Sequence, residues 1–194
     1  MQRFLTFLFL SSSITLMLSC VHKEEHPTRR ASMRHMRPAV IGYYSYYHAE
    51  TDSGHLIRFC LDSILSEGKV QNLNDKNCDP DLISKNRSGK LQFVEVRKDR
   101  IPGRVDSLFY VAHHSKKFVL KDTPHEVYRF QLSNPPIDGR QIRFWTPEFG
   151  FLLWENPDWL DESSLITLDG SSSEDIAQLI QMIKKDTLFF TGGE

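Results

Sequence analysis

The chain has 194 residues, of which 25% are charged and 11% are aromatic, which is an ordinary globular composition. Lysine and arginine total 24 against 25 aspartates and glutamates, so the net charge at pH 7 is −1. Because nucleic-acid-binding domains carry a basic excess, this balance argues against a nucleic-acid partner. The length suits a single domain with its own hydrophobic core.

The first 19 residues have the pattern of a secretory signal peptide. Arg3 supplies a positive start, and the apolar run from Phe4 to Leu18 is shorter than the roughly twenty residues that a membrane-spanning helix needs. The run ends in Leu-Met-Leu-Ser followed by Cys20. This ending resembles the lipobox of bacterial lipoproteins, in the loose form found among Bacteroidota. The family favours Leu where this chain has Met17 and a smaller residue where it has Leu18.

The resemblance implies that Cys20 becomes the first residue of the mature chain and carries diacylglycerol and an N-acyl chain. Two or three acyl chains hold a protein firmly on a membrane, whereas one holds it marginally. The alternatives are an ordinary cleaved signal peptide and an uncleaved membrane anchor. Lys23-Glu24-Glu25 resembles the export signal of surface lipoproteins of Bacteroidota. We therefore expect an outer-membrane location, with the periplasmic and surface faces both open.

Cleavage before Cys20 changes the net charge to −2 and leaves Cys60 and Cys78 as an even pair in an oxidising compartment. We predict a disulfide between them, which stabilises by about 3 kcal/mol in the chain-entropy model. The alternative is a pair of buried free thiols, since an unbridged cysteine packs as a small hydrophobic residue.

The sequence after the leader divides into a tether and one domain. Residues 20–38, the lipidated cysteine and a flexible tether, carry a net charge of +3 and few apolar residues. A single domain of residues 39–194 then begins with a strand over 39–47. Residues 55–67 fit one face of a helix, and the rival interpretation is a strand over 55–61. The helical face would consist of Ile57, Cys60, Leu61, Ile64 and Leu65.

The second half of the chain has the two-residue period of strands, with short turns between them, which favours an antiparallel sheet. A helix follows, which the capping box Ser171-x-x-Glu174 begins. Residues 188–191 read as a final edge strand. We therefore predict an α+β fold, an antiparallel β-sheet with a C-terminal helix packed on one face. The helix would bury one apolar stripe, namely Ile176, Leu179, Ile180 and Ile183.

The sequence predicts no catalytic, cofactor-binding or metal-binding residue. His113 and His114 are adjacent, so in a strand they point to opposite faces, and turn residues separate His48 from His55. No histidine has metal-ligand spacing to a cysteine or an acid. A nucleophile elbow, a phosphate loop and a dinucleotide fingerprint are all missing from the sequence.

Aromatic residues concentrate between positions 144 and 159. Four of them could form a binding surface for a glycan or an envelope protein: Trp145, Phe149, Trp154 and Trp159. The alternative places them in a sheet face under the C-terminal helix.

The sequence thus predicts a lipid-anchored cell-envelope protein that acts as a non-enzymatic binding or assembly component. The alternative function is an envelope hydrolase acting on glycan or peptide. An enzyme requires a concave pocket in which titratable groups converge with shifted pKa values. A binding module requires an exposed apolar or aromatic patch.

Overall fold

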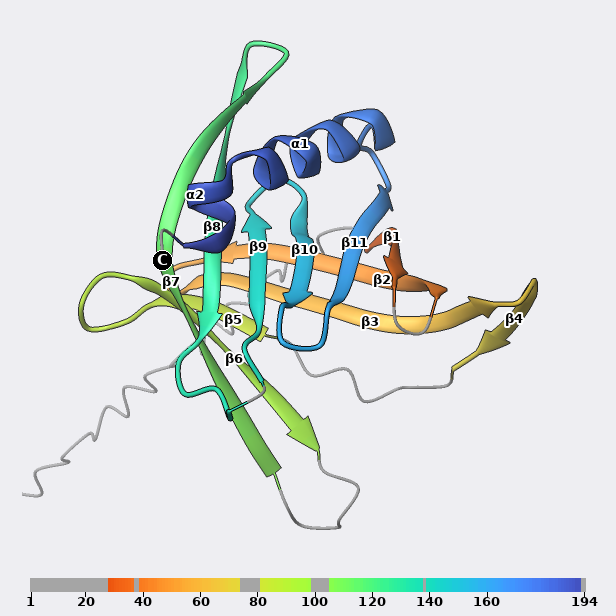
Figure 1. Ribbon diagram of the computed structural model, residues 1–194, viewed down its shortest axis with the longest axis horizontal. Helices are drawn as coiled ribbons and strands as arrows, with labels where there is room; N and C mark the ends of the chain where they lie inside the picture. Colours follow the sequence, from red (N-terminus) through yellow and green to blue (C-terminus); the bar gives the residue numbers. More distant parts are fainter. Residues whose placement is uncertain (1–27, 37–38, 74–80, 99–104, 138, 193–194) are drawn as a thin grey trace, which may run out of the picture.

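The computed structural model describes residues 28–36, 39–73, 81–98, 105–137 and 139–192. These ranges contain eleven strands, all paired antiparallel, and two helices (Figure 1). The strands are β1 (Arg29–His35), β2 (Val40–Thr51), β3 (Gly54–Ser66), β4 (Lys69–Asn72), β5 (Asp81–Lys85), β6 (Leu91–Lys98), β7 (Val105–Leu120), β8 (Thr123–Leu132), β9 (Ile142–Thr146), β10 (Gly150–Asn156) and β11 (Asp161–Leu168). The helices are α1 (Ser173–Lys185) and α2 (Thr187–Thr191).

Ten of these strands close into a barrel. Neighbouring strands from β5 to β11 pair in chain order, β11 pairs with β1, β1 with β2, β2 with β3, and β3 with β5. β4 lies outside the ring and pairs with β3. The predicted α+β class is therefore wrong. The protein is mostly β, and its sheet is closed. The first and last strands pair with each other, which removes the two edges that an open sheet would keep.

Aromatic side chains fill the middle of the barrel. The ring of Phe93 stacks on Tyr110 at 4.4 Å between centroids, and it meets Phe130 and Phe151 edge-on at 5.1 and 5.4 Å. Trp145 contacts Phe130 from the next strand at 6.5 Å. All five side chains are fully or almost fully buried. Each such side chain contributes about 1.5–3 kcal/mol on burial, so this cluster forms the main interior core.

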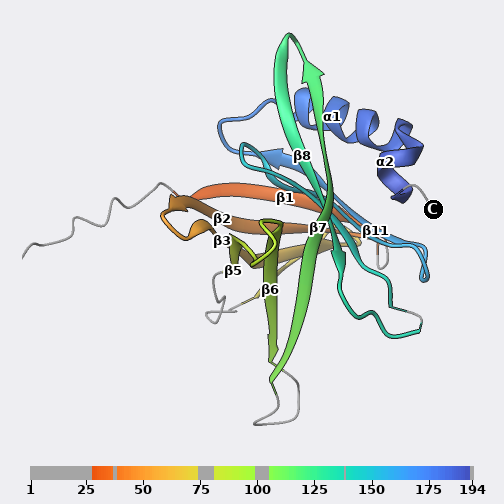
Figure 2. The ribbon, with the colours of Figure 1, turned by 90° about the vertical axis from the view of Figure 1, so that its left-hand side faces the viewer.

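The two helices cover the outside of the barrel (Figures 1 and 2). β9 is buried on both faces, because Trp145 points into the barrel while Phe144 points outward and stacks on Phe190 of α2 at 5.4 Å. α1 and its predicted apolar stripe are confirmed, since all four residues of the stripe are buried. Its N-cap is Ser172, which accepts a hydrogen bond from the backbone of Asp175, one position after the predicted cap. Residues 188–191 lie in α2 and do not form an edge strand.

Residues 55–67 belong to a strand, so the helix predicted there is wrong. β3 pairs with β2 along nearly its whole length, and β4 and β5 pair on its other side. The inward residues Ile57 and Phe59 follow the two-residue period, and Phe59 stacks on Tyr44 of β2 at 4.2 Å. Hydrogen bonding on both sides therefore outweighs the helical pattern of the sequence.

The folded part begins earlier than predicted. β1 takes Arg29–His35 from the segment assigned to the tether, and it is buried between β2 and β11. Cys60 lies in β3, whereas Cys20 and Cys78 lie outside the described residues, so the disulfide and the lipidation stay predictions. None of the helices in the described ranges is long and apolar enough to cross a membrane.

Candidate functional site: the histidine cavity

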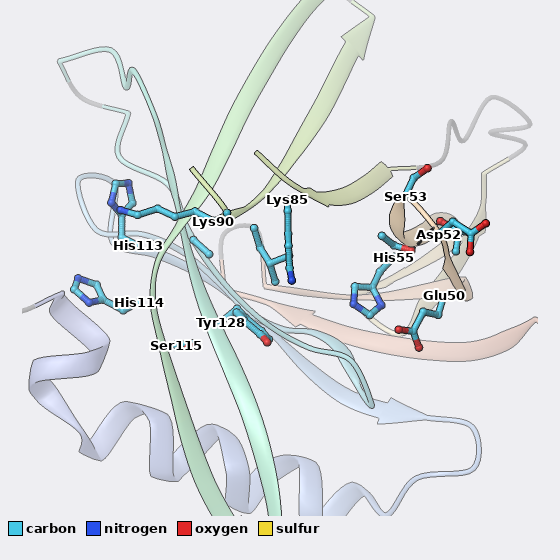
Figure 3. Close-up of a pocket in the computed structure, with 15 residues that line it drawn as sticks. Glu50, Asp52, Ser53, His55, Lys85, Lys90, His113, His114, Ser115 and Tyr128 are labelled. Atoms are coloured by element: carbon cyan, nitrogen blue, oxygen red, sulfur yellow. Dashed lines mark hydrogen bonds between the residues drawn. The ribbon is translucent and has the colours of Figure 1, made fainter. Parts of the chain in front are cut away.

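A cavity of about 820 Å³ opens at one mouth of the barrel (Figure 3). It lies between the β2–β3 turn, the β5–β6 turn and the middle of β7 and β8. We call it the histidine cavity because His55, His113 and His114 all line it. Figure 3 shows Glu50 and Asp52 on one side of this space and Lys90 with His113 on the other. The acidic and basic groups of the cavity therefore lie on opposite walls.

The acidic wall is positioned by the tight turn between β2 and β3. Thr51 pairs with Gly54 across Asp52 and Ser53, and the Thr51 hydroxyl donates to the Gly54 carbonyl at 2.9 Å. Gly54 has φ +135°, and a Cβ there would lie 2.1 Å from the backbone oxygen of Ile83 in β5. Only glycine fits this close approach, which brings the turn against the neighbouring strand.

The basic wall is held by the turn between β5 and β6. The side-chain oxygen of Asn86 accepts hydrogen bonds from the backbone of Ser88 and Lys90, both at 3.0 Å, and from the Ser88 hydroxyl at 2.7 Å. This is the Asx-turn chemistry that makes asparagine a frequent turn residue. The turn fixes the backbone on either side of it, and Lys85 and Lys90 extend from there to the cavity.

A β-bulge sets the histidines of β7. The register between β7 and β8 shifts between Ala112 and His114, so one strand carries an extra residue there. The prediction that His113 and His114 point apart assumed a regular strand, whereas both line the cavity. Burial lowers the pKa of His113, and the charges of Lys90, His114 and Arg129 lower it further. The His113 ring is therefore mostly neutral at pH 7.

His55, which lines the cavity, belongs to a pair of imidazoles that packs on an indole. His48 Nε2 and His55 Nδ1 lie 3.2 Å apart in a hydrogen bond. The His55 ring lies 5.1 Å from Trp145, and the His48 ring meets the same indole edge-on at 6.2 Å. Nearby, burial and then Glu126 and Glu148 raise the pKa of Tyr128 to about 12, so its phenol keeps its proton.

A second cavity, of about 240 Å³, includes Arg143, Trp154, Asp161 and Ser163 in its lining, and we call it the arginine cavity. His35 lies beside it, with Nδ1 2.7 Å from the Ser163 hydroxyl and Nε2 2.8 Å from the Tyr44 hydroxyl. Burial lowers the pKa of His35, although the charge of Asp161 acts in the other direction. Arg143, the cation of this cavity, is engaged by Glu95 and the Tyr110 hydroxyl, and so it is not directed at an oxyanion formed by attack of Ser163. We assign this hydrogen-bonded chain to holding the barrel wall.

The predicted aromatic surface is not assembled on the outside. Trp145 is fully buried, and Phe149 and Trp154 are partly buried against the core. Trp159 is exposed, at 61%, in the turn between β10 and β11. The assignment of Trp145 to a binding surface is therefore wrong. Its ring faces the barrel interior because β9 alternates Arg143 and Trp145 inward with Phe144 outward.

The sequence did not predict that the side chains of His48 and His55 meet. The signal was the spacing: a tight turn at Asp52 and Ser53 places Glu50 opposite His55 and His48 opposite Ile57. Residues two apart share a face of a strand, so all of these side chains point to the same side of the hairpin. A helix over residues 55–67, as the sequence predicts, would not have the register between β2 and β3 that brings these side chains together.

Comparison with known proteins adds no assignment. No protein-family model matches the chain. No curated protein and no solved structure matches it either, so the functional argument stands on the geometry of this molecule.

Proposed function

We propose that this chain is a lipid-anchored cell-envelope protein that binds a small polar ligand in the histidine cavity. The observation that carries the proposal is the cavity itself, about 820 Å³ at the mouth of a closed barrel. This volume lies in the range of small-molecule sites, and closed barrels commonly bind ligands at their mouths. The expected aromatic patch is replaced by this concave polar site.

The anchor in this proposal is lipid on Cys20. Arg29 marks the start of the fold, where its side chain donates to the Asp169 carbonyl at 2.6 Å and to the Ser171 hydroxyl at 2.7 Å. Arg29 lies nine positions after Cys20, and a fully extended chain of that length spans roughly 30 Å. A lipidated protein would therefore hold its barrel close to the membrane surface.

The charged walls favour a ligand with complementary charges. Lys85 and Lys90 are exposed on one turn, and Glu50 and Asp52 are exposed on another. His55 is held by His48, a second imidazole, and not by a carboxylate of the kind that orients a catalytic histidine. This arrangement supports binding more directly than catalysis.

The second candidate is the envelope hydrolase acting on glycan or peptide. The observation in its favour is that histidines and carboxylates line one concave site, and that His113 and Tyr128 have shifted pKa values. A ligand that is cleaved by the wild-type protein and left intact by a His55→Gln variant would favour this candidate.

Thermal-shift and ligand-observed NMR measurements with short glycans and peptides test the binding proposal. We expect a ligand that stabilises the full chain and loses its effect in a Lys85→Ala/Lys90→Ala variant. Lys117→Ala is the matched control, because Lys117 is an exposed lysine of β7 outside the cavity lining. Equal ligand responses in both variants would contradict the cavity as the binding site.

The anchor is tested by labelling cells with radioactive palmitate. We expect label in the wild-type protein and none in Cys20→Ala. Equal labelling of both proteins, or labelling of neither, would overturn the lipid anchor and leave the cavity proposal untouched.

A further inference from the structure

We propose that the His48–His55 pair at the edge of the histidine cavity is a binding site for a divalent transition-metal ion such as Zn²⁺, with Glu50 as the third ligand. This goes beyond the proposed function, because it concerns the imidazole pair and not the charged walls that would select a polar ligand. The first observation is the 3.2 Å separation of His48 Nε2 and His55 Nδ1.

That separation matches two ligands of one ion. Zinc binds imidazole nitrogens at about 2.0–2.1 Å with tetrahedral angles, which places two such nitrogens about 3.3 Å apart. In the hydrogen bond the two nitrogens point at each other, so the distance fits zinc while the ring directions do not yet converge. An ion beside the N–N line would replace the proton that the imidazoles share, after each ring turns toward the ion.

The third ligand follows from the register of the β2–β3 hairpin. Glu50 pairs directly with His55, and it shares a strand face with His48, two residues earlier. Cross-strand neighbours have Cβ atoms about 5 Å apart, which a glutamate side chain can bridge. Within the described ranges no three such side chains already surround one point. The exposed Glu50 side chain, which lies beside His55 in Figure 3, must therefore turn toward the imidazoles on binding.

The surroundings favour an open coordination site. Trp145 is fully buried and lies beneath both rings, so it closes the side of the pair that faces the core. The other side opens into the histidine cavity, which His55 and Glu50 both line. Three protein ligands with a fourth position open to a cavity are the arrangement of zinc sites that bind or activate a small molecule. The fourth position would accept water or an anionic group of a ligand.

The competing explanation is a metal-free hydrogen bond that satisfies two imidazoles at the edge of the core. It predicts that His48 and His55 stabilise the fold and bind no ion. Glutamine substitutions separate the two cases, because glutamine keeps hydrogen-bonding groups and is a poor metal ligand.

The test uses the full chain in detergent, stripped of metal with a chelator and titrated with Zn²⁺ by calorimetry. We expect one Zn²⁺ per chain, and we expect His48→Gln and His55→Gln each to weaken binding by roughly 100-fold or more while the thermal midpoint changes little. Glu50→Gln should also weaken binding, by roughly tenfold or more, because losing a ligand costs at least as much as losing a partner in the outer shell. Glu174→Gln is the matched control and should bind as the wild type does, because Glu174 is an exposed residue of α1 outside the cavity lining.

A second readout reports the position of the ion. Co²⁺ quenches nearby tryptophan fluorescence, and Trp145 lies under the proposed site. We expect quenching in the wild type that is largely lost in Trp145→Phe, while Trp159→Phe retains it. Failure to bind Zn²⁺, or binding that is unchanged in both His48→Gln and His55→Gln, would overturn the proposal and favour the metal-free pair. Neither result affects the experiment with Lys85→Ala/Lys90→Ala, which tests the proposed function separately.

Discussion

The guanidinium of Arg143 lies 4.6 Å from the ring centre of Tyr110, and its Nη2 also donates to the Tyr110 hydroxyl at 3.1 Å. The same nitrogen pairs with Glu95, and the Trp154 ring lies 4.7 Å from the guanidinium on another strand. Arg143 is only 7% exposed. A cation in the interior of the barrel is therefore balanced by one carboxylate and by aromatic rings.

We predict that Arg143→Met destabilises the protein by about 3 kcal/mol, because it removes the guanidinium that pairs with the partly buried Glu95. Replacing Glu95 with Gln in the same chain should recover much of this loss. Arg140→Met is the matched control, since Arg140 forms a more exposed pair with Asp158 at 3.0 Å and should cost at most about 1 kcal/mol. Urea unfolding measures all three, and equal losses for Arg143→Met and Arg140→Met would contradict the prediction.

Gly150 should tolerate no side chain. It has φ +73°, and a Cβ there would lie 2.6 Å from the hydroxyl oxygen and 2.7 Å from the ring of Tyr46, which is fully buried. Gly68 has a similar φ of +75° but open space around it. We expect Gly68→Ala to cost about 1 kcal/mol for the backbone alone and Gly150→Ala to cost several times more. Thermal unfolding of the two variants decides this, and similar midpoints would show that Tyr46 moves aside freely.

Glu155 should make stability depend on pH in a predictable direction. Burial and then the charge of Glu162 raise the pKa of Glu155 above its usual 4.5, against the effects of Lys184, Arg129 and Arg140. The folded state therefore binds this proton more tightly than the unfolded state, so the ionised group opposes folding above the raised pKa. We expect Glu155→Gln to be more stable than wild type at pH 7.

The stability difference between Glu155→Gln and the wild type should shrink as the pH falls through the raised pKa toward the lower pKa of the unfolded state. Below that lower pKa, Glu155 is protonated in both the folded and the unfolded protein. Glu174→Gln is the control, because Glu174 lies on the exposed surface of α1. Denaturant unfolding from pH 7 to pH 4 checks the sign. A stability difference that grows on acidification would refute the assignment.

Arg129 should hold α2 on the barrel. Its side chain is 3% exposed and donates to the backbone carbonyls of Phe190 at 3.1 Å and Thr191 at 3.0 Å. A cation at carbonyls of a helix C-terminus is favourable, and lysine cannot make both contacts from one planar group. We expect Arg129→Lys to speed amide exchange in α2 selectively.

Lys121→Ala is the control for Arg129→Lys, because Lys121 pairs with Asp175 of α1 on the surface at 2.6 Å. Hydrogen exchange with mass spectrometry compares the peptides that cover the two helices. Unchanged exchange in α2 of Arg129→Lys would show that the packing of Phe189 and Phe190 alone is sufficient to hold it.

The sequence predicts local elements better than their assembly. The stripe of α1 could be identified because four apolar residues at helical spacing have one interpretation, a buried helix face. Residues 55–67 had two interpretations, and strand pairing on both sides of β3 decided between them. Pairing between distant strands leaves no mark in local periodicity, so the closure of the barrel could not be read.

The candidate site also depends on strand pairing, which local sequence patterns do not reveal. The six aromatic residues between 144 and 159 drew attention by their number, yet side-chain direction in β9 and β10 puts Trp145 and Phe151 inside the barrel. His48 and His55 lie seven positions apart with turn residues between them, so the sequence did not indicate a shared site. A hairpin turn brings their rings together, and the spacing alone would have revealed this if the hairpin had been recognised.

The seam between β1 and β11 has a consequence for how the molecule is made. Ala31 and Leu168 face each other there, although 137 positions separate them in the chain. Contacts of such long range slow folding. Because the chain is synthesised from its N-terminus, β1 cannot complete its pairing until β11 has been made. In that interval the edge of β1 that β11 will cover offers hydrogen bonds to any other strand. A chain cut before residue 161 would leave this edge of β1 and the facing edge of β10 exposed permanently, so aggregation, and not a smaller stable barrel, is the expected fate of the truncated protein.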